Sequence, residues 1–199
     1  TLLYQVLRSS GEQTSADTNL TSAFSVGTGV RVVNADKLFS QGSIVSTDNA
    51  LDLAVDGAGF FQVLLPDGRI GYTRNGTFSR NNEGALTTSS GFVIQPEVVI
   101  PEDAQEINVS SDGVVSVQLP GAVEQEEVGQ IELAEFQNRN GLQPIGESFY
   151  VETTASGEAI IANPLEGSFG KLVQGALESS NVSVVKELVD MIETQRAYE

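Results

Sequence analysis

Carboxylates are the side chains that could carry acid–base chemistry in this sequence, because the chain has no histidine and no cysteine. Without those two residue types, a Ser-His-Asp triad, a Cys-His pair and a zinc site of nitrogen and sulfur ligands cannot be built. A glycoside hydrolase needs two carboxylates held about 5–10 Å apart. No spacing marks such a pair among the acidic residues, which include Asp48, Asp52, Asp56, Asp67, Glu124, Glu126 and Glu127. We therefore predict no catalytic residue and a protein that is not an enzyme.

Asp52 and Asp56 alternate with apolar residues, so we expect both on the solvent-facing side of a strand. The segment Gly57-Ala58-Gly59 begins like a dinucleotide-binding loop, but it lacks the third glycine and a strand pattern follows it. A tight turn before a core strand explains it better. Five aromatic residues at strand spacing are expected in the core rather than around a ligand: Phe60, Phe61, Tyr72, Phe78 and Phe92. The sequence has no calcium-loop pattern, and we predict no cofactor and no metal site.

The net charge of −17 excludes further classes of function. A nucleic-acid-binding protein needs basic patches that neutralise phosphates, so we predict no nucleic-acid partner. Anionic membrane surfaces should repel the chain. No apolar run approaches the roughly 18 residues of a membrane span, so we predict no membrane insertion.

The elements that must position these residues are short strands separated by turns. Turn signals recur every 8–12 residues or so, a spacing typical of a β-sandwich or a partly closed barrel. Pro66-Asp67-Gly68 predicts one turn, and Asn75-Gly76 predicts a two-residue hairpin with positive φ at both positions. Strands are expected over residues 51–55, 60–65, 69–74, 92–94, 98–100, 107–109, 114–119, 129–136, 149–151, 160–161 and 172–177.

The two ends of the chain read differently. Residues 9–25 are rich in Ser, Thr, Asn and Gly and predict an extended loop, and residues 30–38 predict an extended arm. Ser183 is expected to cap a helix that continues to Glu199. The sequence starts at Thr1 and stops within this helical pattern, so we expect both ends to be cut from a longer chain. The predicted fold is mainly β: a compact β domain with an extended N-terminal arm and a C-terminal helix.

Several blocks in this order resemble the axial proteins of the bacterial flagellar rod and hook. The block LDLAVDGAGFFQV at 51–63 resembles that family's "DLAIDGxGFFxV", and YTRNGTF at 72–78 resembles "YTRNGxF". Further blocks follow in the family's order at 112–115, 145–148 and 179–182, and ELVDMIETQRAYE at 187–199 resembles the start of its C-terminal axial helix. The chain is identified as a core piece of a member of this family that lacks the terminal axial helices.

The resemblance implies a domain organisation and a function. Residues 1–45 would be an arm with a rod-specific polar loop, 46–180 an outer β domain, and 181–199 the start of the axial helix. The segment from Leu2 to Gln5 and the polar residues that follow it resemble an insertion typical of the distal rod members. The implied function is that of a structural subunit in the periplasm-spanning rod of the flagellar basal body, exported by the type III apparatus. The subunit would polymerise with itself, contact proximal rod, hook and surrounding ring proteins, and transmit torque from motor to hook.

Three alternatives remain open at this point. The chain could be a proximal rod or hook paralogue, a β-rich binding or adhesion module, or a carboxylate-based hydrolase, which a pocket with two close buried acids would favour. Helical spacing of 100° per residue gives two apolar seams, one through Val185 and Ile192 and a heptad seam through Met191 and Tyr198, which meet at Leu188. The residues predicted to make assembly contacts are Leu2, Leu3, Tyr4, Val184, Val185, Leu188, Met191, Ile192 and Tyr198.

Overall fold

The apolar run from Phe60 to Leu65 forms β7 (Phe60–Leu64) in the middle of the central sheet. The computed structural model describes residues 4–8, 13–15, 18–19, 24–27, 37–122 and 124–198. The chain consists of two compact units, Thr1–Lys37 and Leu38–Glu199. We call residues 38–181, which precede the helix in the second unit, the β domain. As predicted, the described chain is mainly β with one C-terminal helix. Its sheets are open and form no closed barrel.

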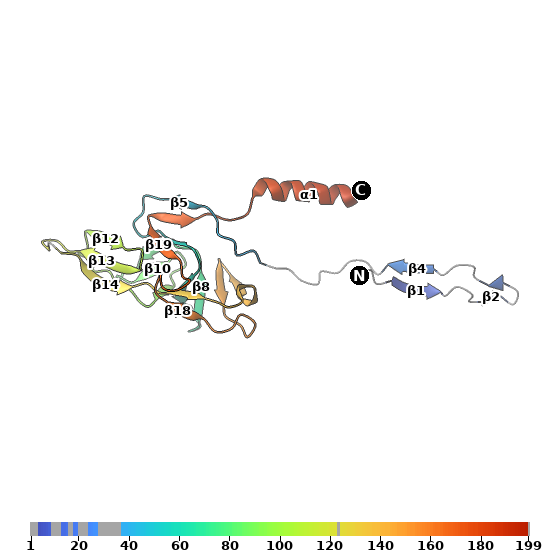
Figure 1. Cartoon of the computed structure of the whole chain (residues 1–199), viewed down its shortest axis with the longest axis horizontal. Helices are drawn as coiled ribbons and strands as arrows, with labels where there is room; N and C mark the ends of the chain where they lie inside the picture. Colours follow the sequence, from blue (N-terminus) through green and yellow to red (C-terminus); the bar gives the residue numbers. More distant parts are fainter. Residues whose placement is uncertain are drawn as a thin grey trace. The chain divides into compact units, whose positions relative to one another are not determined.

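The central sheet has nine strands. Along its main path the order is β16-β17-β8-β7-β11-β10-β9, and β15 joins the side of β7 and carries β18 (Figure 1). Neighbouring strands of this sheet are antiparallel throughout. The strands are β7 (Phe60–Leu64), β8 (Ile70–Thr73), β9 (Phe78–Arg80), β10 (Leu86–Thr88), β11 (Val93–Gln95), β15 (Leu133–Glu135), β16 (Gln143–Gly146), β17 (Phe149–Val151) and β18 (Ile160–Ala162).

Three smaller antiparallel groups complete the β domain. One is a three-stranded sheet of β12 (Glu106–Val109), β13 (Val114–Gln118) and β14 (Glu126–Gln130), which lie side by side at one end of the domain in Figure 1. The second pairs β6 (Leu53–Asp56) with β19 (Lys171–Gln174). The third pairs β5 (Ile44–Ser46) with β20 (Ala176–Glu178). A short 3-10 helix, η1 (Arg139–Gly141), lies before β16.

Phe60 and Phe61 belong to two different cores, because successive side chains in a strand point to opposite faces. Phe61 packs edge-on against Phe78 in the larger core, with the β6–β19 pair and the three-stranded sheet. Phe60 lies in a smaller core with Tyr72, Phe136 and Leu142. Tyr72 is 4% exposed, and burial together with the nearby carboxylate of Glu152 raises its pKa to about 12. The smaller core therefore keeps water away from this phenol ring.

Several local predictions are wrong. Asn75-Gly76 forms no hairpin: β8 pairs with β7 and β17, β9 pairs with β10, and neither residue has positive φ. Gly76 is needed for a different reason, since a Cβ there would lie 1.6 Å from the carbonyl oxygen of Leu53. Asp52 is buried rather than solvent-facing, and its carboxylate accepts hydrogen bonds from Thr47 and Asn49.

Three predicted strands are also revised. The predicted strand over 129–136 is two strands, β14 and β15, in different sheets, and the one over 172–177 is β19 and β20, divided at Gly175. The predicted strand at 98–100 is reduced to an isolated bridge between Ala85 and Val99. The turn at Pro66-Asp67-Gly68 is confirmed, with β7 and β8 on either side of it.

The N-terminal unit contains strands where a loop was predicted. β1 (Tyr4–Arg8) pairs antiparallel with β4 (Phe24–Gly27), and β2 (Gln13–Ser15) pairs with β3 (Thr18–Asn19). Of the range 9–25, residues 13–15, 18–19 and 24–25 are described and lie in strands, so the prediction of an extended loop is wrong there. Most of the arm predicted over residues 30–38 lies outside the described residues.

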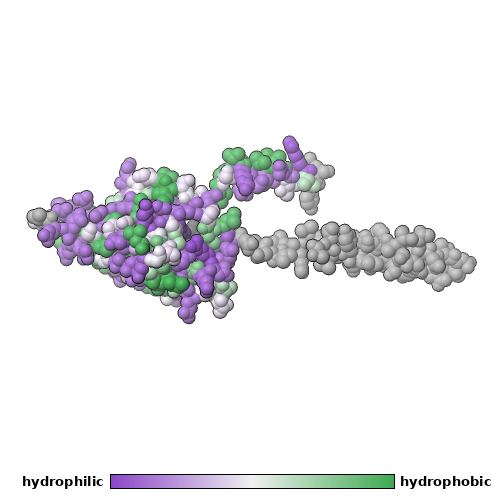
Figure 2. All heavy atoms as spheres, viewed as in Figure 1, coloured by the Kyte–Doolittle hydropathy of each residue, from purple (hydrophilic) through white to green (hydrophobic). Residues whose placement is uncertain are grey.

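The C-terminal helix α1 (Val184–Tyr198) follows β20. The backbone N–H of Glu187 donates to the carbonyl oxygen of Ser183, so the helix starts where the sequence predicted. Its apolar residues are exposed, and Figure 2 shows them as a hydrophobic strip along the helix. Within the described residues, neither helical segment has the length and apolar character required to cross a membrane.

Candidate functional site: the polar junction of the β domain

Both chain connections of the β domain meet at one polar cluster. The entering segment, residues 38–43, leads into β5, and the leaving segment, residues 178–181, begins at the last residue of β20. Because β5 and β20 pair, with Ile44 opposite Glu178, the two connections start side by side. The hydrogen bonding between β5 and β20 continues beyond the two strands, since the N–H of Ser179 donates to the carbonyl oxygen of Ser43 at 2.8 Å. We call these two segments, with the side chain of Arg74, the junction.

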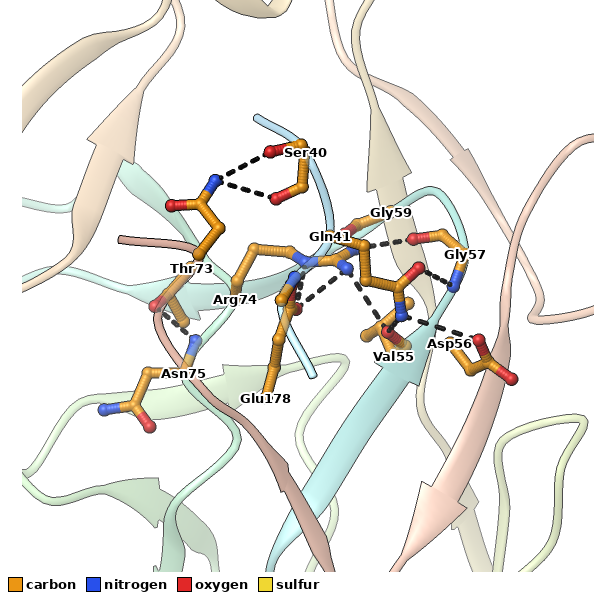
Figure 3. Close-up of polar contacts among 12 residues, drawn as sticks. Ser40, Gln41, Val55, Asp56, Gly57, Gly59, Thr73, Arg74, Asn75 and Glu178 are labelled. Atoms are coloured by element: carbon orange, nitrogen blue, oxygen red, sulfur yellow. Dashed lines mark hydrogen bonds and ion pairs between the residues drawn. The ribbon is translucent and has the colours of Figure 1, made fainter. Parts of the chain in front are cut away.

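Arg74 is the centre of the junction (Figure 3). Its Nη1 donates to the carbonyl oxygens of Gly57 and Gly59 at 2.9 and 2.6 Å, and its Nη2 donates to that of Val55 at 3.2 Å. Its Nε and Nη2 both lie 2.9 Å from Oε2 of Glu178. A planar guanidinium with five N–H donors suits this arrangement, because one side chain serves three carbonyl groups and a carboxylate.

Glu178 links Arg74 to the entering segment. Its Oε1 accepts a hydrogen bond from the backbone N–H of Gly42 at 2.8 Å, while its Oε2 faces Arg74. The side chains of Arg74 and Glu178 are 23% and 13% exposed, so water screens the pair only partly. The guanidinium also lies 6.0 Å from the ring centre of Phe60, within the range of a cation–π contact.

Two amide side chains fasten the connections further (Figure 3). Gln41 pairs with the β domain backbone as a neighbouring strand would: its Oε1 accepts from the N–H of Gly57 and its Nε2 donates to the carbonyl oxygen of Val55, both at 3.1 Å. Asn181 joins the two segments directly, because its Nδ2 donates to the carbonyl oxygens of Leu38 and Ser40. Each connecting segment is thus hydrogen-bonded both to the rest of the β domain and to the other connecting segment.

Packing supports the same arrangement. Phe39 of the entering segment contacts Phe60 and Tyr150 edge-on, at ring-centre distances of 5.9 and 5.5 Å. Gly42 lies so close to the leaving segment that a Cβ would be 1.8 Å from the carbonyl oxygen of Ser179. The two backbones are therefore in contact at this point.

A cleft of about 500 Å³ opens at the junction, lined in part by Arg139, Tyr150 and Asn75. Among the described residues, the acid in its lining is Glu178, and both oxygens of that carboxylate already have partners. The cleft therefore offers no second carboxylate for acid–base catalysis. The described part of the chain also contains no cluster of three or more acidic side chains that could hold a metal ion.

The residues predicted to make assembly contacts are distinct from the junction. Leu2 and Leu3 lie outside the described residues, Tyr4 begins β1, and Tyr198 ends α1. The other predicted residues are exposed on α1: Val184, Val185, Leu188, Met191 and Ile192, by 68, 73, 53, 58 and 49%. Their contacts in an assembly stay a prediction.

Sequence reasoning did not single out the junction residues. Arg74 and Asn181 lie within sequence blocks that carried the family resemblance, but Gln41 and Glu178 do not. The one available signal was a lone arginine directly after a buried strand in an acidic chain. The partners of Arg74 lie far from it in the sequence: Glu178 is 104 residues away, and the backbone carbonyl groups are 15–19 residues away. No local pattern could therefore reveal them.

Comparisons with known proteins match two parts of the chain to family models. Residues 54–117 match the model of the flagellar hook protein FlgE/F/G D1 domain, and residues 173–199 match that of the flagellar basal body rod FlgEFG protein C-terminal region. The first match includes most of the larger core, and the second runs from the end of β19 through β20 and the helix.

Individual relatives extend the match along the chain. It is 48% identical over 198 residues to the flagellar basal-body rod protein FlgG of Buchnera aphidicola subsp. Schizaphis graminum, covering 100% of this chain and 76% of the relative. It is 43% identical over 199 residues to FlgG of Caulobacter vibrioides, with the same coverage. Identity to FlgF of Caulobacter vibrioides is 34% over 165 residues, covering 81% of this chain and 62% of the relative.

Proposed function

The chain belongs to the flagellar basal-body rod protein family, and from that premise we propose that it is a subunit of the distal rod. In this proposal copies of the protein polymerise into a shaft that transmits torque from the motor to the hook. Within one species, Caulobacter vibrioides, the chain is more similar to FlgG than to FlgF, and the match to FlgG covers more of both proteins. This difference favours FlgG-type over FlgF-type identity.

The observation that carries the mechanical part of the proposal is the junction. A subunit that transmits torque must pass force between its axial segments and its β domain without bending where they join. Hydrogen bonds and one ion pair hold both connections in place, and they come from the side chains of Arg74, Glu178, Gln41 and Asn181. If the two connections were flexible, the β domain would rotate around its attachment and the force would not be transmitted.

The exposed strip on α1 supports the polymeric part. Apolar side chains exposed along a helix are covered when the helix packs against neighbours. We propose that other copies of this protein cover it, at Val184, Val185, Leu188, Met191, Ile192 and Tyr198. The proposal also includes contacts with the proximal rod, the hook and the basal-body rings, and assigns the protein no catalytic role.

Complementation distinguishes the distal from the proximal assignment. The natural protein should restore swimming and complete hook–basal bodies to Caulobacter vibrioides cells that lack FlgG, and should fail in cells that lack FlgF. Arg69→Ala serves as the matched control, since this arginine is exposed and lies outside the junction, and it should rescue as well as the natural protein. Rescue of the FlgF deletion rather than the FlgG deletion would assign the chain to the FlgF type.

A further inference from the structure

The sequence contains two asparagine–glycine pairs, Asn75-Gly76 and Asn140-Gly141. In such a pair the glycine nitrogen can attack the side-chain amide carbon of the asparagine, because glycine has no side chain that hinders the approach. The reaction needs a backbone nitrogen that can give up its proton, a polarised carbonyl group and an amide nitrogen that is free to leave. The fold supplies these three conditions to the two pairs unequally.

The surroundings of the two pairs are otherwise closely matched. Asn75 and Asn140 are both exposed. Each glycine is packed against the backbone of another segment, which a Cβ would approach to 1.6 Å at Gly76 and to 2.5 Å at Gly141. The carbonyl group of each glycine also accepts a hydrogen bond. A difference in reactivity would therefore come from the glycine N–H and from the side-chain amide.

The Asn140 pair is held in an unreactive arrangement. It lies in η1, where the N–H of Gly141 donates to the carbonyl oxygen of Asn138 at 3.1 Å. This hydrogen bond keeps the proton on the nitrogen that would have to attack, and the attack would have to break it. We therefore expect folding to protect Asn140.

The Asn75 pair meets all three conditions. Oδ1 of Asn75 accepts a hydrogen bond from the N–H of Thr77 at 3.1 Å, an Asx turn that folds the amide carbon back beside the nitrogen of Gly76. The same hydrogen bond would stabilise the negative charge that develops on Oδ1 during attack. Within the described residues, the N–H of Gly76 and Nδ2 of Asn75 have no hydrogen-bond partner. The side chain of Asn75 extends away from the guanidinium of Arg74 (Figure 3).

We propose that Asn75 is a site of spontaneous deamidation in the folded protein. The nitrogen of Gly76 bonds to the amide carbon of Asn75, its proton passes through water to the departing Nδ2, and ammonia leaves a succinimide ring behind. A water molecule then opens the ring at one of its two carbonyl groups, which gives aspartate or isoaspartate. The oxygen of that water enters the product carboxylate, so the reaction needs no oxidant and no cofactor.

The two products should affect the junction differently. Aspartate leaves the main chain unchanged and keeps an oxygen for the N–H of Thr77. Isoaspartate adds one carbon atom to the main chain between Arg74 and Gly76. Because Gly76 has no room to move against Leu53, Arg74 would be displaced from its acceptors. We therefore expect molecules with isoaspartate at this position to unfold at lower urea concentrations than the unreacted protein.

Incubation in ¹⁸O-labelled water tests the proposal. The 199-residue protein is kept at mildly alkaline pH, once folded and once in urea, and mass spectrometry of its digest counts the ¹⁸O-labelled acid at each Asn-Gly pair. In the folded protein we expect Asn75 to react about tenfold faster than Asn140, the ratio that one hydrogen bond on the attacking nitrogen would impose. In urea the two rates should be similar, because the local sequences alone then decide.

Asn75→Gln is the matched control. Glutamine keeps the amide but would have to close a larger ring, so labelling at position 75 should disappear while labelling at Asn140 stays unchanged. The proposal is overturned if Asn75 reacts no faster than Asn140 in the folded protein, or if the difference between them persists in urea. Isoaspartate-containing molecules that unfold together with the unreacted protein would refute the inferred effect on the junction.

Discussion

Replacing Arg74 by alanine should lower the free energy of unfolding of the β domain by about 3 kcal/mol. The substitution removes the donors that serve the carbonyl groups of Val55, Gly57 and Gly59, and it leaves the mostly buried carboxylate of Glu178 without its cation. Arg74→Lys should recover only part of the loss, because an ammonium group cannot reach this set of acceptors in one plane. Urea titration at pH 7 measures the difference.

Arg69 provides the matched control. It forms an ion pair with Asp67 at 2.6 Å, but its side chain is 60% exposed, so Arg69→Ala should cost less than about 1 kcal/mol. The double variant Arg74→Ala/Glu178→Ala should be less destabilised than the sum of the two single variants, since the second substitution removes the unpaired charge. Equal losses for Arg74→Ala and Arg69→Ala would show that the junction is not held by its arginine.

Gly42→Ala should force the two connections apart. The new Cβ would lie 1.8 Å from the carbonyl oxygen of Ser179, which belongs to the backbone and cannot turn away. Separation would break the hydrogen bonds from Ser179 to Ser43 and from Gly42 to Glu178. We expect a loss of about 2 kcal/mol or more in urea titration, with the largest NMR shift changes in residues 42–46 and 176–181.

Gly91 gives the control for this second substitution. A Cβ at Gly91 meets no atom within 4 Å, although its φ of +86° makes alanine unfavourable by about 1 kcal/mol. Gly91→Ala therefore reports the backbone cost alone. If Gly42→Ala cost no more than Gly91→Ala and left the Ser43–Ser179 hydrogen bond intact, the close contact of the connections would be refuted.

The strands that the sequence predicted well are those with a short apolar run that ends at a clear turn signal. Residues 60–65 are apolar except for Gln62 and are followed by Pro66-Asp67-Gly68, so β7 and its turn follow from nearby residues alone. The C-terminal helix was also predictable, because its apolar spacing continues over four turns after a serine.

Predictions that depended on distant partners failed. Asn75-Gly76 has the residue types of a hairpin, but β8 and β9 each have better partners elsewhere and Gly76 instead lies against the backbone of Leu53. Gly175 carries a positive φ of 67° that divides one apolar run into β19 and β20. As a result, β19 pairs with β6, whereas β20 pairs with β5 at the junction. Only the tertiary fold determines these partners.

Asp52 illustrates the same limit for side chains. The alternation around it is that of a half-exposed strand, yet the turn from Thr47 encloses its carboxylate and satisfies it with two hydrogen bonds. The junction combines these difficulties, because its four polar side chains come from segments that are far apart in the sequence. Each of them alone has the pattern of an ordinary surface residue.

Amide hydrogen exchange along the isolated protein tests most directly whether the connections are rigidly joined to the β domain. We predict that the amides of Gly42, Gly57 and Ser179 exchange as slowly as those of the core strands, because their hydrogen bonds belong to the same cooperative unit. Amides from Met191 to the end of α1 should exchange rapidly, since a helix of 15 residues with exposed apolar side chains is marginal without neighbours. Exchange at Gly42 and Ser179 as fast as in the last turns of α1 would contradict it, because the connections would then be flexible tethers unable to transmit torque.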